Sequence, residues 1–591
     1  MNYTEKLSAI RKLMLTEGID AYIIPSADPH LSEYLPDFYK CIEFVTGFTG
    51  SVSTVVITQN FAGLWADFRY FEQAEAELKG SGFELVKLNI PHTPQYIDWL
   101  KEQLTNGSVI GFDENLVSII MGEMLIKQLA SKQINFKHCD CIDPIWENRP
   151  PLPTANAYLL GDEVTGESMV SKLTAIRSEM KKSNTSHHLI SSLDDIAWVF
   201  NLRGSDVKYN PIALSFALID ENQTTLYIDA HKLSAIDAEK LTNNGVNIAP
   251  YIQVGNDLQK IASESAILID PKRTCSALYK SINNDVKRVL QINPSTNFKA
   301  VKNDLEISNT RKSMVKDGVA MTQFFKWIKE NVNKIEITEL SAAKKLEEFR
   351  AAQIGFVGES FNTIAGYKAH GALPHYATTA ISDAKIEAEG LFLVDSGGQY
   401  HYGTTDITRV IPLGNNTEEE KTDYTLVLKA MIEGSKTRFP KGTCGYQIDA
   451  ITRRPMWEHG LNFGHGTGHG VGYFLNVHEG PQTINASAIP VSMDLGMITS
   501  IEPGIYRTGK HGIRIENLVL TIADECNEFN QFYAFETLTL APIDTTLVKK
   551  ELLEQSQIEW LNNYHTIVYD RISPFLNEEE KAFLKVMTTA I

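Results

Sequence analysis

The pattern of hydrophobic and polar positions in the first 150 residues predicts one α/β domain. Residues 6–17 have the spacing of an amphipathic helix, and residues 70–79 have the same spacing. Between them, residues 21–25, 52–58 and 62–65 are short runs dominated by apolar and β-branched residues, which is typical of strands. Helices and strands that alternate in this way favour a sheet packed against helices.

The same plan recurs after a proline-rich stretch at residues 143–153, which indicates a linker. The β-rich run at residues 53–58 has a counterpart in the β-rich run at residues 215–220. We therefore expect a tandem duplication, with a first domain over residues 1–150 and a second over residues 151–303.

A third domain is expected over residues 304–540, because its first helix has a continuous apolar face. In the helical pattern of residues 307–330, this face consists of Met314, Gly318, Met321, Phe325 and Ile328. Helical patterns at residues 547–569 and 578–587 follow. They predict a C-terminal extension over residues 541–591 that serves packing or assembly and carries no catalytic residue.

Two acidic pairs occur in two short hairpins of this third domain. In the first hairpin, the apolar run at residues 391–394 leads into Asp395, and a return strand at residues 405–411 carries Asp406. If the turn is centred near Tyr400, the two aspartates are near cross-strand neighbours, and the Cβ atoms of such neighbours lie about 5 Å apart.

The second hairpin repeats the arrangement. A strand at residues 497–501 ends at Glu502, turn residues occupy positions 508–512, and the return strand at residues 513–520 carries Glu516. Buried carboxylates this close repel each other, and a cation between them removes the conflict. Four carboxylates match the charge of two dications, and two metals about 3.5–4 Å apart are a recurring hydrolytic device.

A glycine-flanked histidine, His469, lies between the two hairpins in the sequence. His465 and His469 are four residues apart, a spacing that would suggest a zinc pair on a helix. Each interior glycine costs a helix about 1 kcal/mol, so the glycine-rich run at residues 464–470 is excluded as a helix. An oxygen-rich ligand set with one imidazole favours hard or borderline metals such as Mn²⁺. A single acidic residue at a strand end is usually a solvated or capping residue, but five residues in this arrangement favour a metal site.

These segments resemble the metal-binding motifs of the pita-bread metallopeptidases, which include methionine aminopeptidase, prolidase and aminopeptidase P. The runs at residues 465–472 and 475–481 are most similar to aminopeptidase P. The resemblance implies an α+β fold, with a C-terminal pita-bread catalytic domain preceded by two creatinase-like α/β domains. The N-terminal part of the resemblance rests on residues 26–30, 65–70 and 201–206. Two such domains point to the three-domain type of aminopeptidase P.

The resemblance also implies roles for individual residues. The ligands of two metals are expected to be Asp395, Asp406, His469, Glu502 and Glu516. The histidines expected to handle the substrate in catalysis are His375, His465 and His478. Arg514 matches an arginine that lies behind the metal ligands near the last of them, and it is also expected to help bind the substrate. Arg69 matches an arginine that reaches the far end of the substrate. The competing interpretation of Arg69 is a surface salt bridge with Asp67.

The activity that the resemblance implies is that of a metallo-aminopeptidase, which hydrolyses the N-terminal Xaa-Pro bond of peptides. A hydroxide shared by the two metals would attack the carbonyl, Glu502 would shuttle the proton, and His478 or His375 would polarise the carbonyl. A prolidase-type Xaa-Pro dipeptidase is the alternative, which the length of the chain and its doubled N-terminal region disfavour. The complete acidic set disfavours a catalytically inactive binding scaffold and a metal-free creatinase-type hydrolase.

Composition limits the partners of the protein. The net charge of −18 argues against a general binder of nucleic acid or of anionic membranes. The scattered cysteines form neither a disulfide framework nor a zinc-binding spacing; they are Cys41, Cys139, Cys141, Cys275, Cys444 and Cys526. Reduced thiols, together with the lack of a signal-peptide pattern and of a long apolar run, predict a cytoplasmic protein. The resemblance implies a homodimer.

Overall fold

The computed structural model describes every residue except 91–92, and it divides into two compact units. Unit 1 comprises Met1–Gly161 and Glu167–Ser295, and unit 2 comprises Asp162–Gly166 and Thr296–Ile591. All five expected metal ligands belong to unit 2. The expected domain boundaries near residues 150, 303 and 540 remain predictions.

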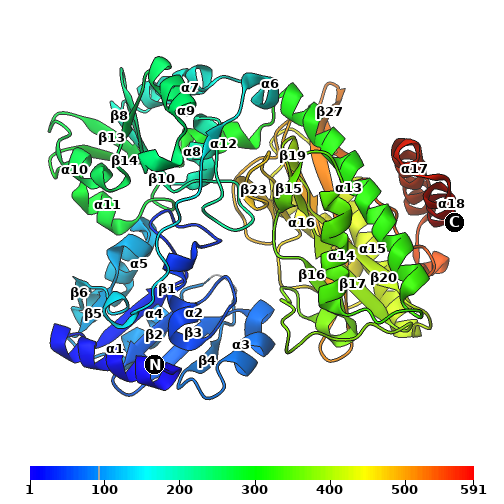
Figure 1. Ribbon diagram of the computed structural model, residues 1–591, viewed down its shortest axis with the longest axis horizontal. Coiled ribbons are helices and arrows are strands. Elements are labelled where there is room, and N and C mark those ends of the chain that lie inside the picture. Colours follow the sequence, from blue (N-terminus) through cyan, green and yellow to red (C-terminus); the bar gives the residue numbers. More distant parts are fainter. Residues whose placement is uncertain (91–92) are drawn as a thin grey trace. The chain divides into compact units, whose positions relative to one another are not determined.

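Unit 1 contains two six-stranded sheets that share one topology (Figure 1). The first has the order β4–β3–β2–β1–β5–β6, with the bounds Glu84–Lys87, Ala62–Ala66, Thr54–Thr58, Ala21–Pro25, Val109–Phe112 and Asn135–His138. The second has the order β12–β11–β10–β8–β13–β14, with the bounds Val246–Ala249, Thr224–Ile228, Ser215–Asp220, His187–Ile190, Ala266–Ile269 and Lys287–Leu290. A short two-stranded sheet, β7–β9, joins Tyr158–Leu159 to Leu202–Arg203.

The strand directions confirm the repeated plan. β1 is antiparallel to β2 and parallel to β5, just as β8 is antiparallel to β10 and parallel to β13. At one edge, β3 and β4 are parallel, and so are β11 and β12. The two β-rich runs compared in the sequence form β2 and β10, which occupy equivalent positions in their sheets.

The helices of unit 1 follow local signals in the sequence. α1 (Tyr3–Glu17) begins at a capping box between Asn2 and Glu5 and ends where Gly18 adopts a left-handed conformation. The predicted helix at residues 70–79 is the shorter α3 (Phe71–Glu77). The other helices are α2, α4, α5, α7, α8, α9, α10 and α11, with the bounds Cys41–Thr46, Tyr96–Gln103, Ile119–Leu129, Met169–Lys182, Leu193–Val199, Ala235–Asn243, Val254–Gln259 and Ser276–Ser281. α12 (Pro294–Ala300) then leads into unit 2.

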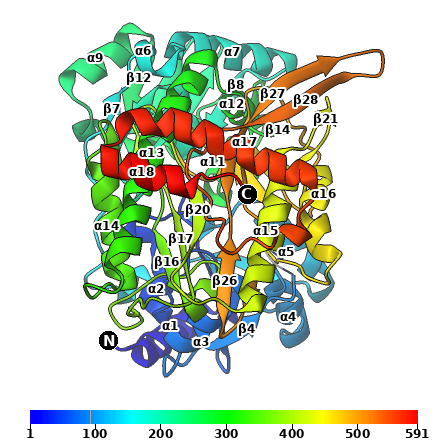
Figure 2. The same ribbon diagram turned by 90° about the vertical axis from the view of Figure 1, so that its right-hand side faces the viewer.

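Unit 2 contains one six-stranded sheet, two three-stranded sheets and one two-stranded sheet (Figure 2). The three-stranded sheet β16–β17–β20 has the bounds Ile364–Tyr367, Leu391–Ser396 and Ile407–Pro412. The six-stranded sheet β21–β28–β27–β24–β22–β23 has the bounds Phe439–Pro440, Gln531–Thr537, Asn517–Cys526, Ile498–Ile501, Gly468–Gly470 and Glu479–Ile484. The small sheets are β15–β18–β19 (Phe356–Glu359, Gly398–Tyr400 and Gly403–Thr404) and β25–β26 (Gly504–Arg507 and His511–Arg514).

Long helices flank these sheets. α13 (Asp304–Asn331) confirms the predicted first helix of the third domain, and all five residues of its predicted apolar face are buried. Gly318 lies so close to the backbone of Leu540 that an added Cβ would meet the Leu540 carbonyl oxygen at 2.0 Å. The other helices of unit 2 are α6, α14, α15, α16, α17 and α18, with the bounds Asp162–Thr165, Glu339–Ala351, Glu418–Ser435, Gly445–Trp457, Gln555–Ile572 and Glu578–Met587.

The C-terminal extension packs on the hydrophobic core of unit 2, as expected for a packing role. α18 has the predicted bounds, whereas α17 begins at Gln555 and not near Leu547. The prediction was wrong there because Glu554 forms a capping box with Gln557, which fixes the helix start. The apolar side of α17 joins the hydrophobic core that contains the strand residue Leu518.

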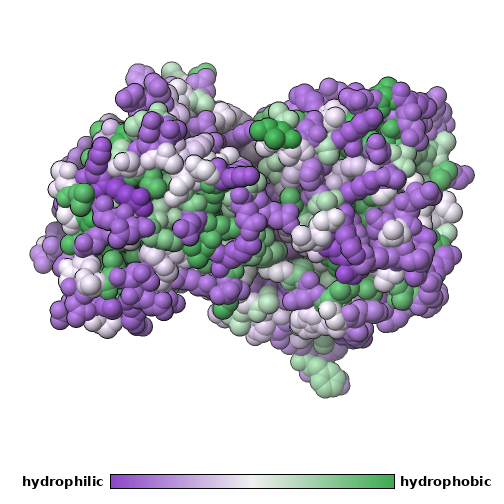
Figure 3. Space-filling view, turned by 90° about the horizontal axis from the view of Figure 1, so that it is seen from below, coloured by the Kyte–Doolittle hydropathy of each residue, from purple (hydrophilic) through white to green (hydrophobic). Residues whose placement is uncertain are grey.

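The described residues contain no helix that is both long and apolar enough to cross a membrane. On the face seen in Figure 3, hydrophilic residues predominate, and hydrophobic residues lie in small groups among them.

Candidate metal centre

The first acidic pair lies where β17 and β20 begin to diverge. β17 is a buried apolar run that ends in Asp395 and Ser396, and Asp395 pairs with Thr408 of β20. Asp406 directly precedes the first residue of β20 and is two residues before Thr408. Because side chains alternate along a strand, Asp406 lies on the same side of the sheet as Thr408 and its partner Asp395. The two aspartates are therefore diagonal neighbours.

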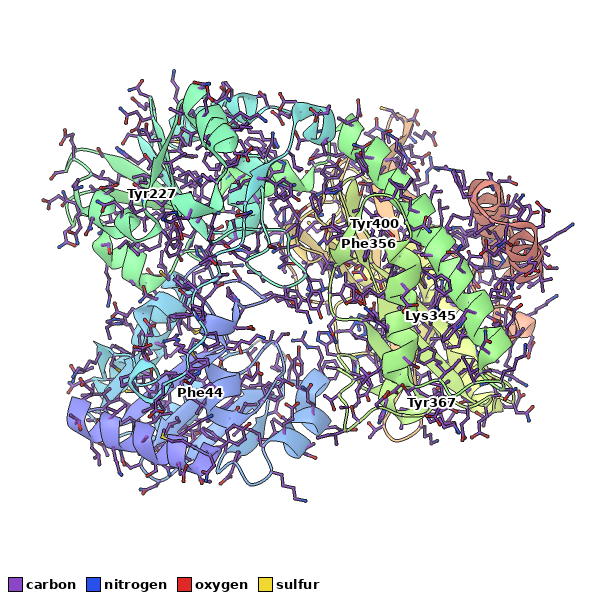
Figure 4. All side chains as sticks on the ribbon, viewed as in Figure 1. Phe44, Tyr227, Lys345, Phe356, Tyr367 and Tyr400 are labelled. Atoms are coloured by element: carbon purple, nitrogen blue, oxygen red, sulfur yellow. The ribbon has the colours of Figure 1, made fainter. Side chains whose placement is uncertain are left out.

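The connection between the two aspartates is more elaborate than a single turn. It forms β18 and β19, which pair with each other, and β18 also pairs with β15. Tyr400 of β18 is fully buried beside Phe356 of β15, with ring centroids 5.7 Å apart (Figure 4). The predicted return strand at residues 405–411 was wrong at its start: β20 begins at Ile407, because residues 405–406 connect it to β19 of the other sheet.

The second acidic pair has the predicted symmetry. Ile501 pairs with Asn517, and Gly504 pairs with Arg514, so Glu502 and Glu516 stand opposite each other between the two paired segments. The predicted continuous return strand is in fact divided, since β26 ends at Arg514 and β27 starts at Asn517.

His469 lies on β22, and its ring faces the acidic groups. Its Nε2 is 3.4 Å from Asp406 Oδ2 and 3.5 Å from Glu502 Oε1. Its Nδ1 lies 2.9 Å from the carbonyl oxygen of Gly470, which places the ring proton on Nδ1 and leaves Nε2 free to bind a metal. Asp406, His469 and Glu516 each offer a ligand atom, and these three atoms lie within 4.8 Å of one another.

Without bound cations, the carboxylates of this cluster repel one another. Burial and the charges of Asp406, Glu502 and Asp395 raise the pKa of Glu516 well above its usual range. Burial raises the pKa of Glu502 to about 7, although His469 and Arg514 act in the opposite direction. Burial lowers the pKa of His469, but the carboxylates of Asp406 and Glu502 outweigh it and raise this pKa to about 9. Dications among these groups would remove the repulsion.

One buried oxygen supports the fit of this cluster to metal ions. Asp395 Oδ1 is buried and has no hydrogen-bond partner within the part of the chain that the structure describes. The other oxygen of Asp395 accepts a hydrogen bond from Arg514 Nη2 at 2.5 Å. A buried carboxylate oxygen without a donor is costly, and metal coordination satisfies it.

Arg514 connects several members of the site. In addition to the hydrogen bond from its Nη2 to Asp395, Arg514 donates from Nε to Thr408 Oγ1 at 3.1 Å and from Nη1 to the Tyr506 hydroxyl at 2.6 Å. Thr408 Oγ1 in turn donates to Glu516 Oε2 at 2.8 Å. Arg514 thus reaches the last acidic residue through Thr408, whereas its direct carboxylate partner is Asp395.

The predicted substrate-handling histidines lie near the cluster. The ring of His478 meets that of His469 edge to face, with centroids 4.3 Å apart. His465 Nε2 is 2.8 Å from the Tyr506 hydroxyl, which also accepts from Arg514. His375 follows Pro374, whose carbonyl oxygen lies 3.4 Å from Arg514 Nη2.

Sequence reasoning missed Thr408 and Tyr506. Thr408 lies two residues after Asp406, on the same side of the strand, which is the signal that could have identified it. Tyr506 lies four residues after Glu502, but only the pairing of β25 with β26 brings its hydroxyl to Arg514.

Arg69 belongs to unit 1 and forms a two-pronged ion pair with Asp67. Its Nε and Nη2 lie 2.8 Å and 2.7 Å from the two carboxylate oxygens. The ion pair with Asp67 is therefore present, but it is largely buried and does not lie at the surface as that interpretation expected; a contact between Arg69 and the far end of a substrate remains a prediction.

Comparison with known protein families supplies the decisive observation. Residues 308–523 match the model of metallopeptidase family M24. Residues 6–145 and 148–306 each match a model of the creatinase/prolidase N-terminal domain, and residues 531–591 match the C-terminal region of peptidase M24. The chain belongs to metallopeptidase family M24.

Relatives within family M24 match the chain from end to end. Xaa-Pro aminopeptidase ApepP of Drosophila melanogaster is 37% identical and covers 98% of this chain, which spans 97% of that protein. Aminopeptidase P2 of Arabidopsis thaliana is 37% identical over 97% of this chain and 86% of its own length. The crystal structure of X-prolyl aminopeptidase from Caenorhabditis elegans, described as a cytosolic enzyme with a di-nuclear active site, is 34% identical. It covers 100% of both chains with a TM-score of 0.96. The fold is therefore α+β, with creatinase-type N-terminal domains and a C-terminal pita-bread domain.

Proposed function

We propose that this protein is a dinuclear metallo-aminopeptidase that removes the N-terminal residue from peptides whose second residue is proline. The observation that carries the proposal is the convergence of four carboxylates and one imidazole, from two hairpins and β22, in a chain similar over its whole length to Xaa-Pro aminopeptidases.

We assign five residues as the ligands of two divalent metal ions, on the basis of their geometry and donor chemistry. They are Asp395, Asp406, His469, Glu502 and Glu516. When bound, the two ions would supply Lewis acidity and a water molecule activated at neutral pH. The oxygen-rich set favours Mn²⁺ among the candidate metals.

The surrounding residues orient the ligands and handle protons. Arg514 holds Asp395 and supports Glu516 through Thr408, which fixes both carboxylates in place. Glu502 is assigned the proton-shuttle role, because a carboxylate beside the metal ions can also accept a hydrogen bond from the attacking water.

We assign the three histidines to the substrate. His478 lies against the ligand His469 and is suited to donate to the oxygen of the scissile carbonyl. Hydrogen bonds from Arg514 to Tyr506 and from Tyr506 to His465 keep the ring of His465 oriented, with its Nδ1 proton directed to the carbonyl of Gly466. His375 lies in the loop that Arg514 contacts at Pro374.

Selectivity for proline follows from the chemistry of the Xaa-Pro bond. This bond has no N–H group, so a selective site accepts the pyrrolidine ring by shape and presents no acceptor for an N–H. Phe361, Tyr376 and Tyr473 are our candidates for the apolar walls of the site, and all three are buried. The hydroxyls of Tyr376 and Tyr473 donate to Glu339 and to the carbonyl of Val164, which gives both rings a fixed position. The prolidase alternative receives less support, because the relatives that match the whole chain carry the aminopeptidase name.

We also propose that the enzyme works in the cytosol and as a homodimer. The proposed location is supported by the C. elegans relative, which is described as cytosolic, and by the six free cysteines.

Metal analysis combined with mutation tests the proposed site. Asp406→Ala and Glu516→Ala are expected to abolish activity and to prevent loading of two metals per chain, measured by elemental analysis after dialysis. Activity that survives complete chelation, in a protein without divalent metal, would refute the proposed centre.

A further inference from the structure

The motif that begins at His478 contains a second polar residue, Glu479, for which the proposed chemistry provides no role. Glu479 is the first residue of β23, and its side chain is almost fully buried. It is not among the residues assigned to the metals, although it directly follows the proposed substrate-handling histidine.

Two lysines converge on this carboxylate from a distant part of the chain. Lys299 Nζ lies 2.9 Å from Glu479 Oε2, and Lys302 Nζ bonds to Glu479 Oε1. The side chains of all three residues are at most 1% exposed. Lys302 Nζ also donates to the carbonyl oxygen of Lys299 at 2.8 Å. We call these three residues the Glu479 clamp.

The clamp is firmly attached to the catalytic unit on its lysine side. The backbone N–H of Lys302 donates to the carbonyl of Gly496 at 3.0 Å, and Val301 forms a bridge with Met497, next to β24. The ammonium groups are thus held by backbone hydrogen bonds that do not depend on Glu479.

The clamp is equally well connected to the metal ligands on its other side. Glu479 pairs with Gly470, the neighbour of His469. The two strands are so close that a Cβ on Gly470 would lie 2.6 Å from the carbonyl oxygen of Glu479. The residue before Glu479 is His478, whose ring touches that of His469. Any shift of Glu479 therefore moves His478 relative to a metal ligand.

We propose that Glu479, held by Lys299 and Lys302, is a positioning residue that fixes His478 against His469 for the reaction. This inference rests on the substrate role of His478 proposed above. A carboxylate that is ion-paired with two buried ammonium groups keeps its place, because its departure would remove the negative charge that stabilises both of them. A small misplacement of a catalytic group lowers the reaction rate strongly, so loss of such an anchor should lower kcat.

The test compares Glu479→Gln in two backgrounds. In the otherwise unchanged enzyme, loaded with metal, we expect kcat for an Xaa-Pro-Xaa tripeptide to fall by about ten-fold or more, with KM and metal content little changed. In a His478→Ala background, the same substitution is expected to lower kcat by less than about two-fold, because the group being positioned is already absent. Glu479→Asp, which keeps the charge, is expected to recover part of the lost kcat.

A control and a second variant separate positioning from stability. Lys232→Met removes a lysine from a buried ion pair with Asp206 in unit 1, and it is expected to leave kcat unchanged in folded protein. Lys302→Met attacks the clamp from its lysine side and should lower kcat in the same direction, so the inference is testable even if Glu479→Gln does not fold.

Two results would overturn the inference in distinguishable ways. An equal loss of kcat from Glu479→Gln in both backgrounds would show that Glu479 does not act through His478, while leaving the proposed function intact. An unchanged kcat for His478→Ala alone would overturn the role of His478 itself, and with it this inference.

Discussion

Arg409 joins the metal-binding strands to the C-terminal extension, and its replacement by Met is expected to destabilise unit 2 strongly. The guanidinium is fully buried, and its nitrogens donate to six acceptors. These are the carbonyl oxygens of Pro542, Thr408, Glu516 and Ala541, the side-chain oxygen of Asn517 and the hydroxyl of Tyr564.

The magnitude follows from what the substitution leaves behind. Thr408 and Ala541 keep other donors, since their carbonyls also accept from the N–H of Glu516 and from the hydroxyl of Tyr564. The Tyr564 hydroxyl still donates to the carbonyls of Thr539 and Ala541. The remaining three acceptors depend on the guanidinium: the carbonyls of Pro542 and Glu516 and the side-chain oxygen of Asn517. At about 1–3 kcal/mol for each buried acceptor, offset in part by the removal of a buried charge, the free energy of unfolding should fall by about 3–5 kcal/mol.

Urea unfolding of the full-length protein measures this effect, with hydrogen exchange in α17 as a local readout. Arg311→Met is the matched control, because Arg311 pairs with Glu536 at a partly exposed site where an ion pair contributes about 0–1 kcal/mol. We expect faster exchange in α17 for Arg409→Met alone. If Arg409→Met unfolds within about 1 kcal/mol of the unchanged protein, or leaves exchange in α17 as it was, the extension is not anchored in this way.

Three further predictions concern the histidines and a buried carboxylate. Replacing His375, His465 or His478 with Ala should lower kcat/KM by about 10²-fold or more while both metals stay bound, and loss of a metal from any of them would contradict its substrate role. Burial lowers the pKa of His565 from 6.5 to about 4, so as the pH falls the unfolded state takes up a proton at a higher pH than the folded state does. The free energy of unfolding should therefore fall by up to about 3 kcal/mol as the pH drops from about 6.5 to about 4. The substitution His565→Gln should reduce this pH dependence, as measured by urea unfolding at several pH values. The carboxylate of Glu339 accepts hydrogen bonds from four residues around the loop that carries His375. Glu339→Gln should therefore destabilise the protein by about 2–3 kcal/mol and lower kcat/KM. An unchanged melting temperature would contradict this role of Glu339.

Local patterns in the sequence were sufficient where the physical cause is local. The opposition of Glu502 and Glu516 could be predicted, because turn residues lie midway between two apolar runs and set the register. The glycines around His469 excluded a helix, and the structure has strand β22 there. α13 was predicted because its apolar period is long and continuous.

Features that depend on distant segments could not be predicted from the sequence alone. β18 is stabilised by its pairing with β15, some 40 residues earlier in the chain, so the diagonal offset of Asp395 and Asp406 was missed. The Glu479 clamp depends on lysines about 180 residues away. Such contacts follow from tertiary packing, on which local propensity carries no information.

The measurement that tests the central claim most directly uses two matched tripeptides that differ only in Pro or Ala at the second position. Both are hydrolysed by protein first stripped of metal and then titrated with Mn²⁺. The account predicts that activity appears as two metal ions bind per chain, and that kcat/KM for the proline peptide exceeds that for the alanine peptide by a wide margin. Comparable kcat/KM for the two peptides would contradict the specificity for Xaa-Pro bonds, and full activity in the stripped protein would contradict the metal centre.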